Sequence, residues 1–435
     1  MKFRKKVLPL MIGITLAAGS LSGCGSNGAA TESQTTEAVT PAATERAVSD
    51  TKASETQSEA MKDTEADSQK ETQETAQSEA ADGADDQADA SKLAIQYAKN
   101  FKIEYMDNDV KLVTDSEDRE LLLVPKDAEV PAGYEDKILV RTPLEHAMYT
   151  STTHVGYLAP LNNESVYDSI AAVTTDESQW TTQAILDRFK SGQIKFVNQD
   201  HWTSGDVEEI TSIKPDMVFS GVGDQSGADL RAQLDEVGIH YVSVGDYTEK
   251  SSEANMEWIK FFGAFYNLDQ EAADAFNKIE QNIADLRDKV KDTKDEEKPK
   301  VAVGMVYDGV VYTQAGDSTT AKEIESAGGT YALSDLEGDG SVQLGMEEFV
   351  DKCKDADILI YASMIQYTPD LKFIADLDPL MSEFKAYQDQ QIYVYDNGYY
   401  MNNTAVDEKF QDLVSILHPE AVPDHELKHY IKLGE

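Results

Sequence analysis

The sequence predicts an α/β protein with two doubly wound lobes that are bridged by a single long α-helix. Between residues 253 and 292, apolar residues recur at steps of three and four, which marks one face of a long helix. Strands and helices alternate before this segment and alternate again after it, the pattern of parallel sheets covered by helices. We therefore expect lobes at 93–252 and 294–435 and a connecting helix at 253–293.

The same periodicity also fits an ordinary core helix of one large α/β domain. Gly263 and the step from Asn267 to Asp269 weaken the helical pattern. A kink or a break into two helices is therefore expected at that point.

Length and charge limit the class of protein. A chain of 435 residues is long enough for two sizeable cores. It carries 81 acidic against 38 basic residues, a net charge of −43. Such a chain is a poor partner for the phosphates of nucleic acid and for the surface of anionic lipid.

The N-terminus differs from the rest of the chain. Basic residues at positions 2, 4, 5 and 6 precede an apolar run over 7–18, which is typical of a secretion signal and short for a membrane span. The ending Leu21-Ser22-Gly23-Cys24 resembles the bacterial lipobox. This resemblance implies a signal peptide at 1–23, a lipid on Cys24 and anchoring at the outer face of the cytoplasmic membrane. A plain signal peptide with an incidental cysteine is the alternative.

Residues 24–92 read as a lipidated cysteine followed by an acidic linker without aromatic residues. Such a composition cannot bury a core and predicts an extended tether. The only other cysteine, Cys353, precedes an apolar strand and is expected to be a small buried hydrophobe.

The first lobe is expected to begin near Leu93. Its predicted elements are strands at 103–106, 110–114, 120–124 and 138–142, a helix from Leu144, parallel strands at 170–174, 194–197, 217–220 and 240–244, and helices at 178–190, 206–213 and 228–237.

The second lobe repeats the alternation. Its predicted elements are strands at 300–306, 310–314, 357–361 and 391–395, and helices at 318–327, 346–354, 379–387 and 404–417.

Three stretches resemble a known family, the substrate-binding proteins of ABC importers for ferric siderophores, haem and vitamin B12. They are Ile138-Leu139-Val140-Arg141-Thr142-Pro143-Leu144-Glu145, the segment from Asp206 to Val218 around Lys214-Pro215-Asp216, and Ala327-Gly328-Gly329. The resemblance implies two lobes joined by one long helix, as in the helical-backbone periplasmic binding proteins. It implies a monomer that captures a metal chelate between the lobes and passes it to a permease driven by an ATPase.

Local chemistry agrees with two of these motifs. Pro215 ends a helix and favours an extended chain, so that a strand follows directly. Gly328 and Gly329 permit a left-handed helix end.

Candidate ligand contacts lie where strands of both lobes end, because a ligand between α/β lobes meets the carboxyl ends of their strands. They are Arg141, Thr142, His201, Trp202, Gln225, Tyr247, Tyr307, Tyr312, Met364, Tyr399 and Tyr400. Rings and neutral hydrogen-bonding groups suit a bulky, partly apolar ligand better than a bare ion. No resident cofactor and no metal held by the protein itself are expected. A surface ion pair for Arg141 and loop packing for His201 and Trp202 remain alternatives.

Residues 299–435 contain no arginine. Because arginine forks are the usual partners of strongly anionic ligands, this favours a neutral or weakly charged chelate, such as a hydroxamate-type ferric siderophore or a corrinoid. Haem is the further alternative, with His201, Tyr399 or Met364 as axial ligand.

Two acids are expected to dock the permease. By the same resemblance, one lies on each lobe: Glu145 fits the first position, and Glu323 or Glu325 the second. Acids that are merely solvated on helix surfaces would have the same appearance.

An enzyme is not expected. His425-Glu426-Leu427-Lys428-His429 fits the His-Glu-x-x-His zinc pattern, but only Glu435 follows as a further ligand, so a solvated tail helix is the favoured interpretation. A surface metallohydrolase built on these histidines is one rival class. A sensor or adhesive lipoprotein that serves no permease is the other.

Overall fold

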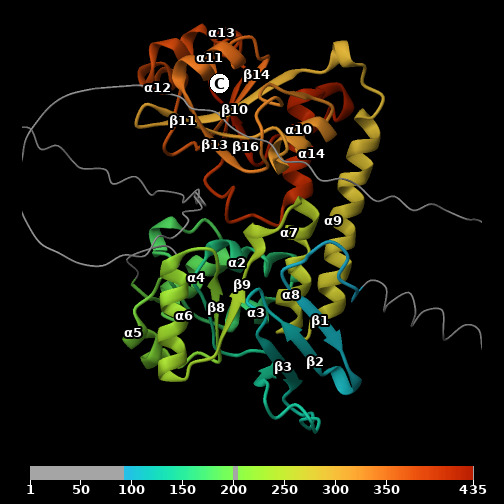
Figure 1. Ribbon diagram of the computed structural model, residues 1–435, viewed down its shortest axis with the longest axis vertical. Coiled ribbons are helices and arrows are strands. Elements are labelled where there is room, and N and C mark those ends of the chain that lie inside the picture. Colours follow the sequence, from blue (N-terminus) through green and yellow to red (C-terminus); the bar gives the residue numbers. More distant parts are fainter. Residues whose placement is uncertain (1–92, 199–203, 435) are drawn as a thin grey trace, which may run out of the picture. The chain divides into compact units, whose positions relative to one another are not determined.

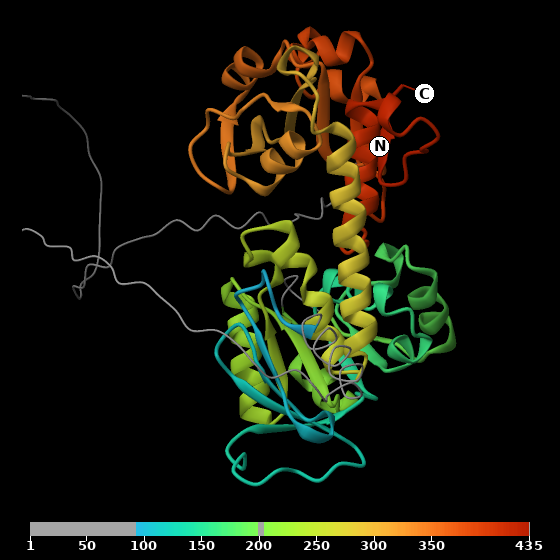
Figure 2. The same ribbon diagram turned by 90° about the vertical axis from the view of Figure 1, so that its right-hand side faces the viewer.

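The computed structural model describes residues 93–198 and 204–434, and these residues fall within one compact unit. The predictions for Cys24, the linker, His201 and Trp202 lie outside the described residues. Figure 1 labels the elements, and Figure 2 shows them after a quarter turn.

The first lobe is built on a five-stranded parallel sheet in the order β7-β6-β5-β8-β9. Its strands are β5 (Ala147–Tyr149), β6 (Ile170–Val173), β7 (Lys195–Phe196), β8 (Met217–Gly221) and β9 (Tyr241–Val244). Its helices are α2 (Thr152–Gly156), α3 (Glu164–Asp168), α4 (Gln183–Ser191), α5 (Val207–Ile213) and α6 (Gln225–Val237), with 3-10 turns η2 (Ala159–Leu161), η3 (Glu177–Gln179) and η4 (Asp246–Thr248). The four parallel strands and three later helices predicted for this lobe are confirmed, with shifted ends.

Both faces of this sheet are covered. Met148, Val218 and Leu234 belong to a cluster on the face next to α5 and α6, and Figure 1 shows α6 beside β8. Tyr149 and Phe219 stack at 4.7 Å within the larger core on the other face. A sheet buried on both faces is the doubly wound arrangement predicted for this lobe.

A second sheet precedes the first, in the order β1-β2-β3-β4. It consists of β1 (Lys102–Tyr105), β2 (Lys111–Thr114), β3 (Glu120–Pro125) and β4 (Ile138–Thr142), with the short turn η1 (Asp107–Asp109) between the first two. Strands β1, β2 and β3 pair antiparallel, whereas β4 runs parallel to β3. The four strands predicted between residues 103 and 142 are thereby present, with shifted ends.

The helix predicted from Leu144 is wrong. The backbone N–H groups of Glu145 and His146 donate to the Asp216 carboxylate at 3.2 and 2.9 Å, and the chain continues into β5, a central strand of the sheet. Asp216, the acid of the Lys-Pro-Asp motif, thus fixes the entry to β5. The motif also behaves as predicted, since α5 ends at Ile213 and β8 begins at Met217.

The second lobe contains a seven-stranded sheet with the path β13-β11-β10-β14-β15-β16, and β12 pairs with β10. Its strands are β10 (Lys300–Tyr307), β11 (Val310–Gln314), β12 (Thr330–Tyr331), β13 (Ser341–Gly345), β14 (Ile358–Met364), β15 (Ile392–Tyr395) and β16 (Tyr430–Lys432). Strands β10, β12, β14 and β15 run parallel, and the others pair antiparallel at the margins.

The helices of the second lobe are α10 (Thr319–Ser326), α11 (Met346–Cys353), α12 (Leu371–Leu377), α13 (Lys385–Gln388) and α14 (Val406–Leu417), with turns η5 (Asp295–Glu297), η6 (Pro379–Glu383) and η7 (Pro419–Ala421). Three of the four predicted helices are present, and the one at 379–387 is η6 followed by α13. Gly328 follows α10 with a φ of +82°, the predicted left-handed helix end. Cys353 is buried, as predicted.

The segment predicted as one connecting helix is three helices: α7 (Ser252–Met256), α8 (Trp258–Ala264) and α9 (Asp269–Val290). The expected break lies between α8 and α9. There, the buried Lys111 ammonium contacts the Asp269 carboxylate at 2.9 Å and the side-chain oxygen of Asn267 at 3.0 Å. Helix α9, unbroken in Figure 2, packs against α8 and η2 in the first lobe and against α14 in the second.

The tail helix predicted around His425 is also wrong, because residues 425–429 form no helix and lead into β16. Both imidazoles are turned inward. His425 Nε2 lies 2.5 Å from the Asp412 carboxylate, and His429 Nε2 lies 3.2 Å from Glu408.

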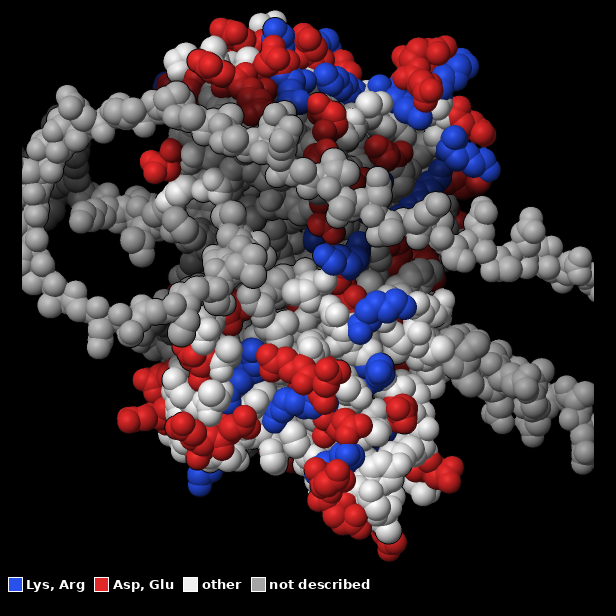
Figure 3. Space-filling view, viewed as in Figure 1, with Lys and Arg blue, Asp and Glu red and all other residues white. Residues whose placement is uncertain are grey.

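Among residues 93–198 and 204–434, no helix combines the length and the apolar character that a membrane span requires. On the face drawn in Figure 3, acidic and basic side chains are interspersed over the described surface.

Candidate functional site

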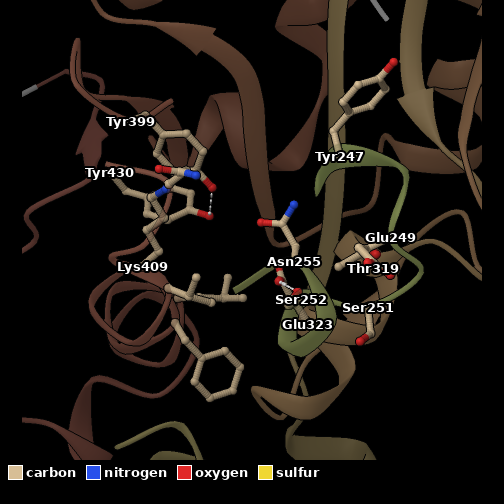
Figure 4. A pocket seen from close by; sticks show the side chains of 14 residues that line it. Tyr247, Glu249, Ser251, Ser252, Asn255, Thr319, Glu323, Tyr399, Lys409 and Tyr430 are labelled. Atoms are coloured by element: carbon tan, nitrogen blue, oxygen red, sulfur yellow. Dashed lines mark hydrogen bonds between the residues drawn. The ribbon is translucent and has the colours of Figure 1, made fainter. Parts of the chain in front are cut away.

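A cavity of about 350 Å³ lies between the two lobes, and we call it the inter-lobe cavity. Figure 4 shows the side chains that line it. The lining residues are Tyr247, Glu249, Ser251, Ser252, Asn255, Thr319, Glu323, Tyr399, Asn403, Val406, Lys409, Phe410, Leu413 and Tyr430. The first-lobe residues follow the carboxyl end of β9, and Tyr399 follows the carboxyl end of β15. The cavity is therefore placed where strands of both lobes end, as predicted for a ligand site.

Several polar side chains of the first-lobe wall already form hydrogen bonds with neighbouring residues. The Ser251 side chain caps α7 by accepting from the Ala254 N–H. The Glu249 carboxylate accepts from the N–H groups of Lys99 and Asn100, each at 3.0 Å. The Asn255 side chain donates to the Asp246 carbonyl and accepts from the Tyr157 hydroxyl. These hydrogen bonds hold the side chains of the first-lobe wall in place.

The second-lobe wall is aromatic. Tyr399 stacks on Tyr395 with ring centroids 3.9 Å apart, and its hydroxyl lies 3.3 Å from that of Tyr430. Burial raises the pKa of the Tyr399 and Tyr430 phenols above the ordinary value, so both hydroxyls stay protonated and can donate. Phe410 and Leu413 on α14 add apolar surface. This wall suits a ligand that is partly apolar and carries oxygen atoms.

Two charged side chains of the second lobe enter the cavity. Glu323 on α10 accepts a hydrogen bond from the Ser252 hydroxyl of the first lobe, and burial raises the pKa of its carboxyl. The Lys409 ammonium lies 4.3 Å from the centroid of the Tyr399 ring. Burial lowers the pKa of Lys409 to about 8, although the charges of Glu323 and Asp396 favour the charged form.

The structure brings two of the predicted ligand contacts, Tyr247 and Tyr399, into the inter-lobe cavity. The Tyr247 hydroxyl donates to the Val222 carbonyl. Tyr400 lies beside them, edge-on to Tyr399 at 5.4 Å, without lining the cavity.

The other described candidates lie elsewhere. Arg141 is exposed and donates to the carbonyls of Pro125 and Ala128, at 3.1 and 2.8 Å. Gln225 is exposed on the first turn of α6 and bonds Asp229 at 2.7 Å. The remaining four are buried or half-buried and do not line the cavity: Thr142, Tyr307, Tyr312 and Met364.

The candidate docking acids differ in their exposure to solvent. Glu145 is exposed and pairs with Lys126. Glu325 is exposed on α10, whereas the Glu323 carboxylate faces Ser252 inside the cavity. Of the two second-lobe acids, only Glu325 remains available at the surface.

Sequence reasoning missed most of the cavity. Ser252, Asn255 and Lys409 belong to helices, and Tyr430 begins β16, a strand that was not predicted from the sequence. A search confined to strand ends cannot find helix residues. The available signal was Lys409 itself, a cation one turn into an amphipathic helix that directly follows the Tyr399 loop.

A family model for periplasmic binding proteins matches residues 149–399. The chain belongs to the periplasmic binding protein family. An uncharacterized lipoprotein of Methanocaldococcus jannaschii is 28% identical over 362 residues, covering 78% of this chain and 85% of the relative. A second uncharacterized lipoprotein of that organism is 24% identical over 348 residues, covering 78% and 86%.

Solved structures share the fold. The molybdate periplasmic binding protein MolA of Haemophilus influenzae aligns with a TM-score of 0.54 at 14% identity, covering 73% of this chain and 94% of that one. Helicobacter pylori CeuE with Ni(II) bound aligns with a TM-score of 0.51 at 17% identity, covering 66% and 88%. These likenesses confirm the predicted two-lobed α/β class.

Members of this family are extracytoplasmic binding proteins, so the prediction of a non-enzymatic function is confirmed. The described part of the chain offers no group of three or more His, Cys, Asp or Glu side chains arranged to hold a metal ion. The lining of the inter-lobe cavity combines aromatic rings, hydroxyls, amides, two carboxyl groups and one amine.

Proposed function

We propose that this chain is the lipid-anchored solute-binding component of an ABC importer and that it carries a metal chelate in the inter-lobe cavity. The observation that supports this most directly is the composition of the cavity, whose wall comes from both lobes and joins Tyr247 of the first to Tyr399 and Tyr430 of the second. A ligand that touches both walls favours the closed arrangement of the lobes, which a permease can distinguish from the empty one.

A chelate with hydroxamate groups fits the cavity chemistry. The lining includes tyrosine hydroxyls, apolar side chains and a single amine, and none of the lining residues is an arginine. Strongly anionic catecholate chelates would need more positive charge than this. A corrinoid is the alternative of the same importer type.

Haem fits the described residues less well. The Tyr399 hydroxyl is engaged with Tyr430 and its ring is stacked on Tyr395, while Met364 is buried where β14 pairs with β15. Neither side chain is placed to serve as an axial ligand.

The anchor is proposed on Cys24, supported by the lipobox-like sequence and by the lipoprotein character of two relatives. Cys24→Ala should release the protein from the membrane fraction, whereas Cys353→Ala, which removes the other cysteine, should leave it there. Retention of the Cys24→Ala protein in the membrane fraction would contradict the anchor.

Docking is proposed through exposed Glu145 on the first lobe and exposed Glu325 on the second. Glu145→Arg should abolish import while ligand affinity stays unchanged. Unchanged import would contradict a role in docking and would favour a sensor or adhesin with the same fold.

Binding is tested by titrating the full chain, purified in detergent, with ferric hydroxamates, cobalamin and haem while following tryptophan fluorescence. Trp258 lies next to the wall of the cavity, since its indole N–H is 3.3 Å from Glu249. Tyr399→Ala should weaken binding of the best ligand by about tenfold or more, the loss expected for a buried aromatic contact. Tyr134→Ala is the matched control and should bind like the wild type, because Tyr134 lies in the loop between β3 and β4 and packs against the separate four-stranded sheet. An unaltered affinity in Tyr399→Ala would place the ligand elsewhere.

A further inference from the structure

The inter-lobe cavity is lined by one lysine, Lys409, whose ammonium has no hydrogen-bond acceptor among the described residues. Among the described residues, no side chain or carbonyl accepts a hydrogen bond from Lys409 Nζ, and no carboxylate lies within ion-pair distance of it. Its ammonium lies 4.3 Å from the centroid of the Tyr399 ring. Figure 4 shows Lys409 on the same side of the cavity as Tyr399 and Tyr430.

Two fully buried lysines of this chain, Lys260 and Lys111, have carboxylate partners. Lys260 Nζ contacts the Glu257 carboxylate at 3.0 Å and the Ala94 carbonyl at 2.8 Å. Lys111 Nζ contacts the Asp269 carboxylate at 2.9 Å. Burying an unpaired charge costs free energy, so an amine left without such partners needs another explanation.

The nearest carboxylate of the cavity is already engaged. Glu323 accepts the hydroxyl of Ser252 from the opposite lobe, and it acts on Lys409 only through the longer-range attraction of charge. The other acid in the lining, Glu249, is occupied by backbone N–H groups of residues 99 and 100. Lys409 is therefore the one cationic side chain in this lining, and none of the described residues accepts a hydrogen bond from it.

We propose that Lys409 is a specificity-determining residue that makes the inter-lobe cavity prefer ligands carrying one free anionic oxygen, a carboxylate in particular. This inference rests on the proposed function for the identity of the carrier molecule, a chelate, and adds the group by which that chelate is recognised. The anionic oxygen receives the Lys409 N–H groups, and the ligand body lies against Tyr399, Phe410 and Leu413. A charge-assisted hydrogen bond of this kind gives about tenfold or more in affinity.

The test uses two ferric trihydroxamates that differ in one group. They are ferrioxamine B capped at its free amine with an acetyl group, which leaves the complex neutral, or with a succinyl group, which adds a carboxylate. The full chain in detergent should bind the succinyl form about tenfold or more tightly than the acetyl form. Lys409→Met should remove this preference, so that the variant binds the two forms with equal affinity, while Lys409→Arg should retain it.

A variant that should increase the preference for the succinyl form complements Lys409→Met. Glu323→Gln removes the negative charge that attracts the Lys409 ammonium, so it should increase the ratio of the affinity for the succinyl form to that for the acetyl form. Lys322→Met is the matched control for Lys409→Met. It also removes a lysine, but from the exposed side of α10, and should bind both forms like the wild type. Equal affinity of the wild type for the two forms, or a preference that survives Lys409→Met, would overturn the inference.

A second readout needs no chelate and separates the two proposals. Succinate at millimolar concentration should raise the thermal unfolding temperature of the wild type but not of Lys409→Met, and neutral succinamide should raise neither. If no ferric hydroxamate, corrinoid or haem binds, the proposed function fails, yet a succinate effect that depends on Lys409 still supports the inference. No succinate effect in the wild type counts against the inference even if a chelate binds.

Discussion

Lys260 and Lys409 are both lysines whose amines lie inside the protein, but they stand in opposite surroundings. Lys260 is 1% exposed, and its ammonium is bound to the Glu257 carboxylate and to the Ala94 carbonyl beside α8. Lys409 lines a cavity, its ammonium lies 4.3 Å from the centroid of the Tyr399 ring, and no hydrogen-bond acceptor for it is found within residues 93–198 and 204–434. The first lysine completes a structural network, whereas the second retains an unused binding capacity. This difference in partners is the basis of the ligand-binding role proposed for Lys409.

The Glu257 network also holds the first described residues in place. Its carboxylate accepts the backbone N–H groups of Gln96, Tyr97 and Ala98, at 2.9, 2.8 and 3.0 Å, besides the Lys260 ammonium. All of these donors lose their acceptor if the carboxylate is removed.

The largest effect is therefore expected for Glu257→Ala. It should lower the free energy of unfolding by about 3–5 kcal/mol, because it leaves Lys260 buried and unpaired. Urea denaturation followed by circular dichroism measures this. The matched control is Glu253→Ala, which breaks an ion pair with the partly exposed Arg287 and should cost less than about 1 kcal/mol. Equal losses for the two variants would remove the distinction between structural and exposed pairs.

The pH dependence of stability tests the unpaired lysine. The pKa of Lys409 is lowered by burial from 10.5 to about 8 in the folded protein. Between these pH values the unfolded chain binds more protons than the folded chain, so this group makes stability rise as pH rises. The difference in unfolding free energy between wild type and Lys409→Met should shift by about 3 kcal/mol in favour of the wild type across this window.

Subtracting the variant cancels the titration of the tyrosines, which is common to both proteins. A constant difference from neutral to alkaline pH would show that Lys409 is as well compensated as Lys260. That result would end the contrast between the two lysines.

A third test concerns the contact between the lobes. A Cβ on Gly156, at the end of α2, would lie 2.5 Å from the Met401 carbonyl oxygen and 2.0 Å from the Asn403 side-chain oxygen. Gly156→Ala should therefore destabilise the protein by about 1–3 kcal/mol, the usual cost of overpacking. Hydrogen exchange of residues 396–404 should rise as well, because this loop carries the displaced atoms. Gly345→Ala is the control, since a Cβ there meets no atom within 4 Å and its φ is −69°.

The smallest effect is expected for Ser252→Ala, which removes the hydroxyl that Glu323 accepts. The loss should be about 1 kcal/mol, the net contribution of one hydrogen bond. Because Glu323 is then free to turn to Lys409, the variant should also weaken binding of the succinylated ferrioxamine. An unchanged affinity would show that Ser252 does not determine which partner Glu323 takes.

The fold class could be predicted from sequence because hydrophobic periodicity reports directly on which faces are buried. The pattern at 269–290 gave α9, and the Lys-Pro-Asp step gave the start of β8. The errors arose where a long-range contact decides the local conformation. Asp216 binds the N–H groups of Glu145 and His146, and Asp412 fixes His425, and both acids are distant in sequence from the segments they hold.

The candidate site was less accessible to prediction for a related reason. Strand ends can be located from sequence, and this approach found Tyr247 and Tyr399. It also selected Arg141, whose guanidinium caps nearby carbonyls, because a sequence does not show whether a charge already has partners. Lys409 and Glu323 depend on the packing of α14 and α10, and that packing is set by tertiary contacts.

Glu249 connects the first described residues of the chain with the inter-lobe cavity. Its carboxylate clamps the backbone at Lys99 and Asn100, and the same side chain forms part of the cavity lining. Tension applied at residue 93 would therefore be resisted at Glu257 and Glu249 before it reached β1. If the proposed lipid anchor on Cys24 holds the chain at the membrane, a pull on that anchor reaches the rim of the inter-lobe cavity through the Glu249 carboxylate.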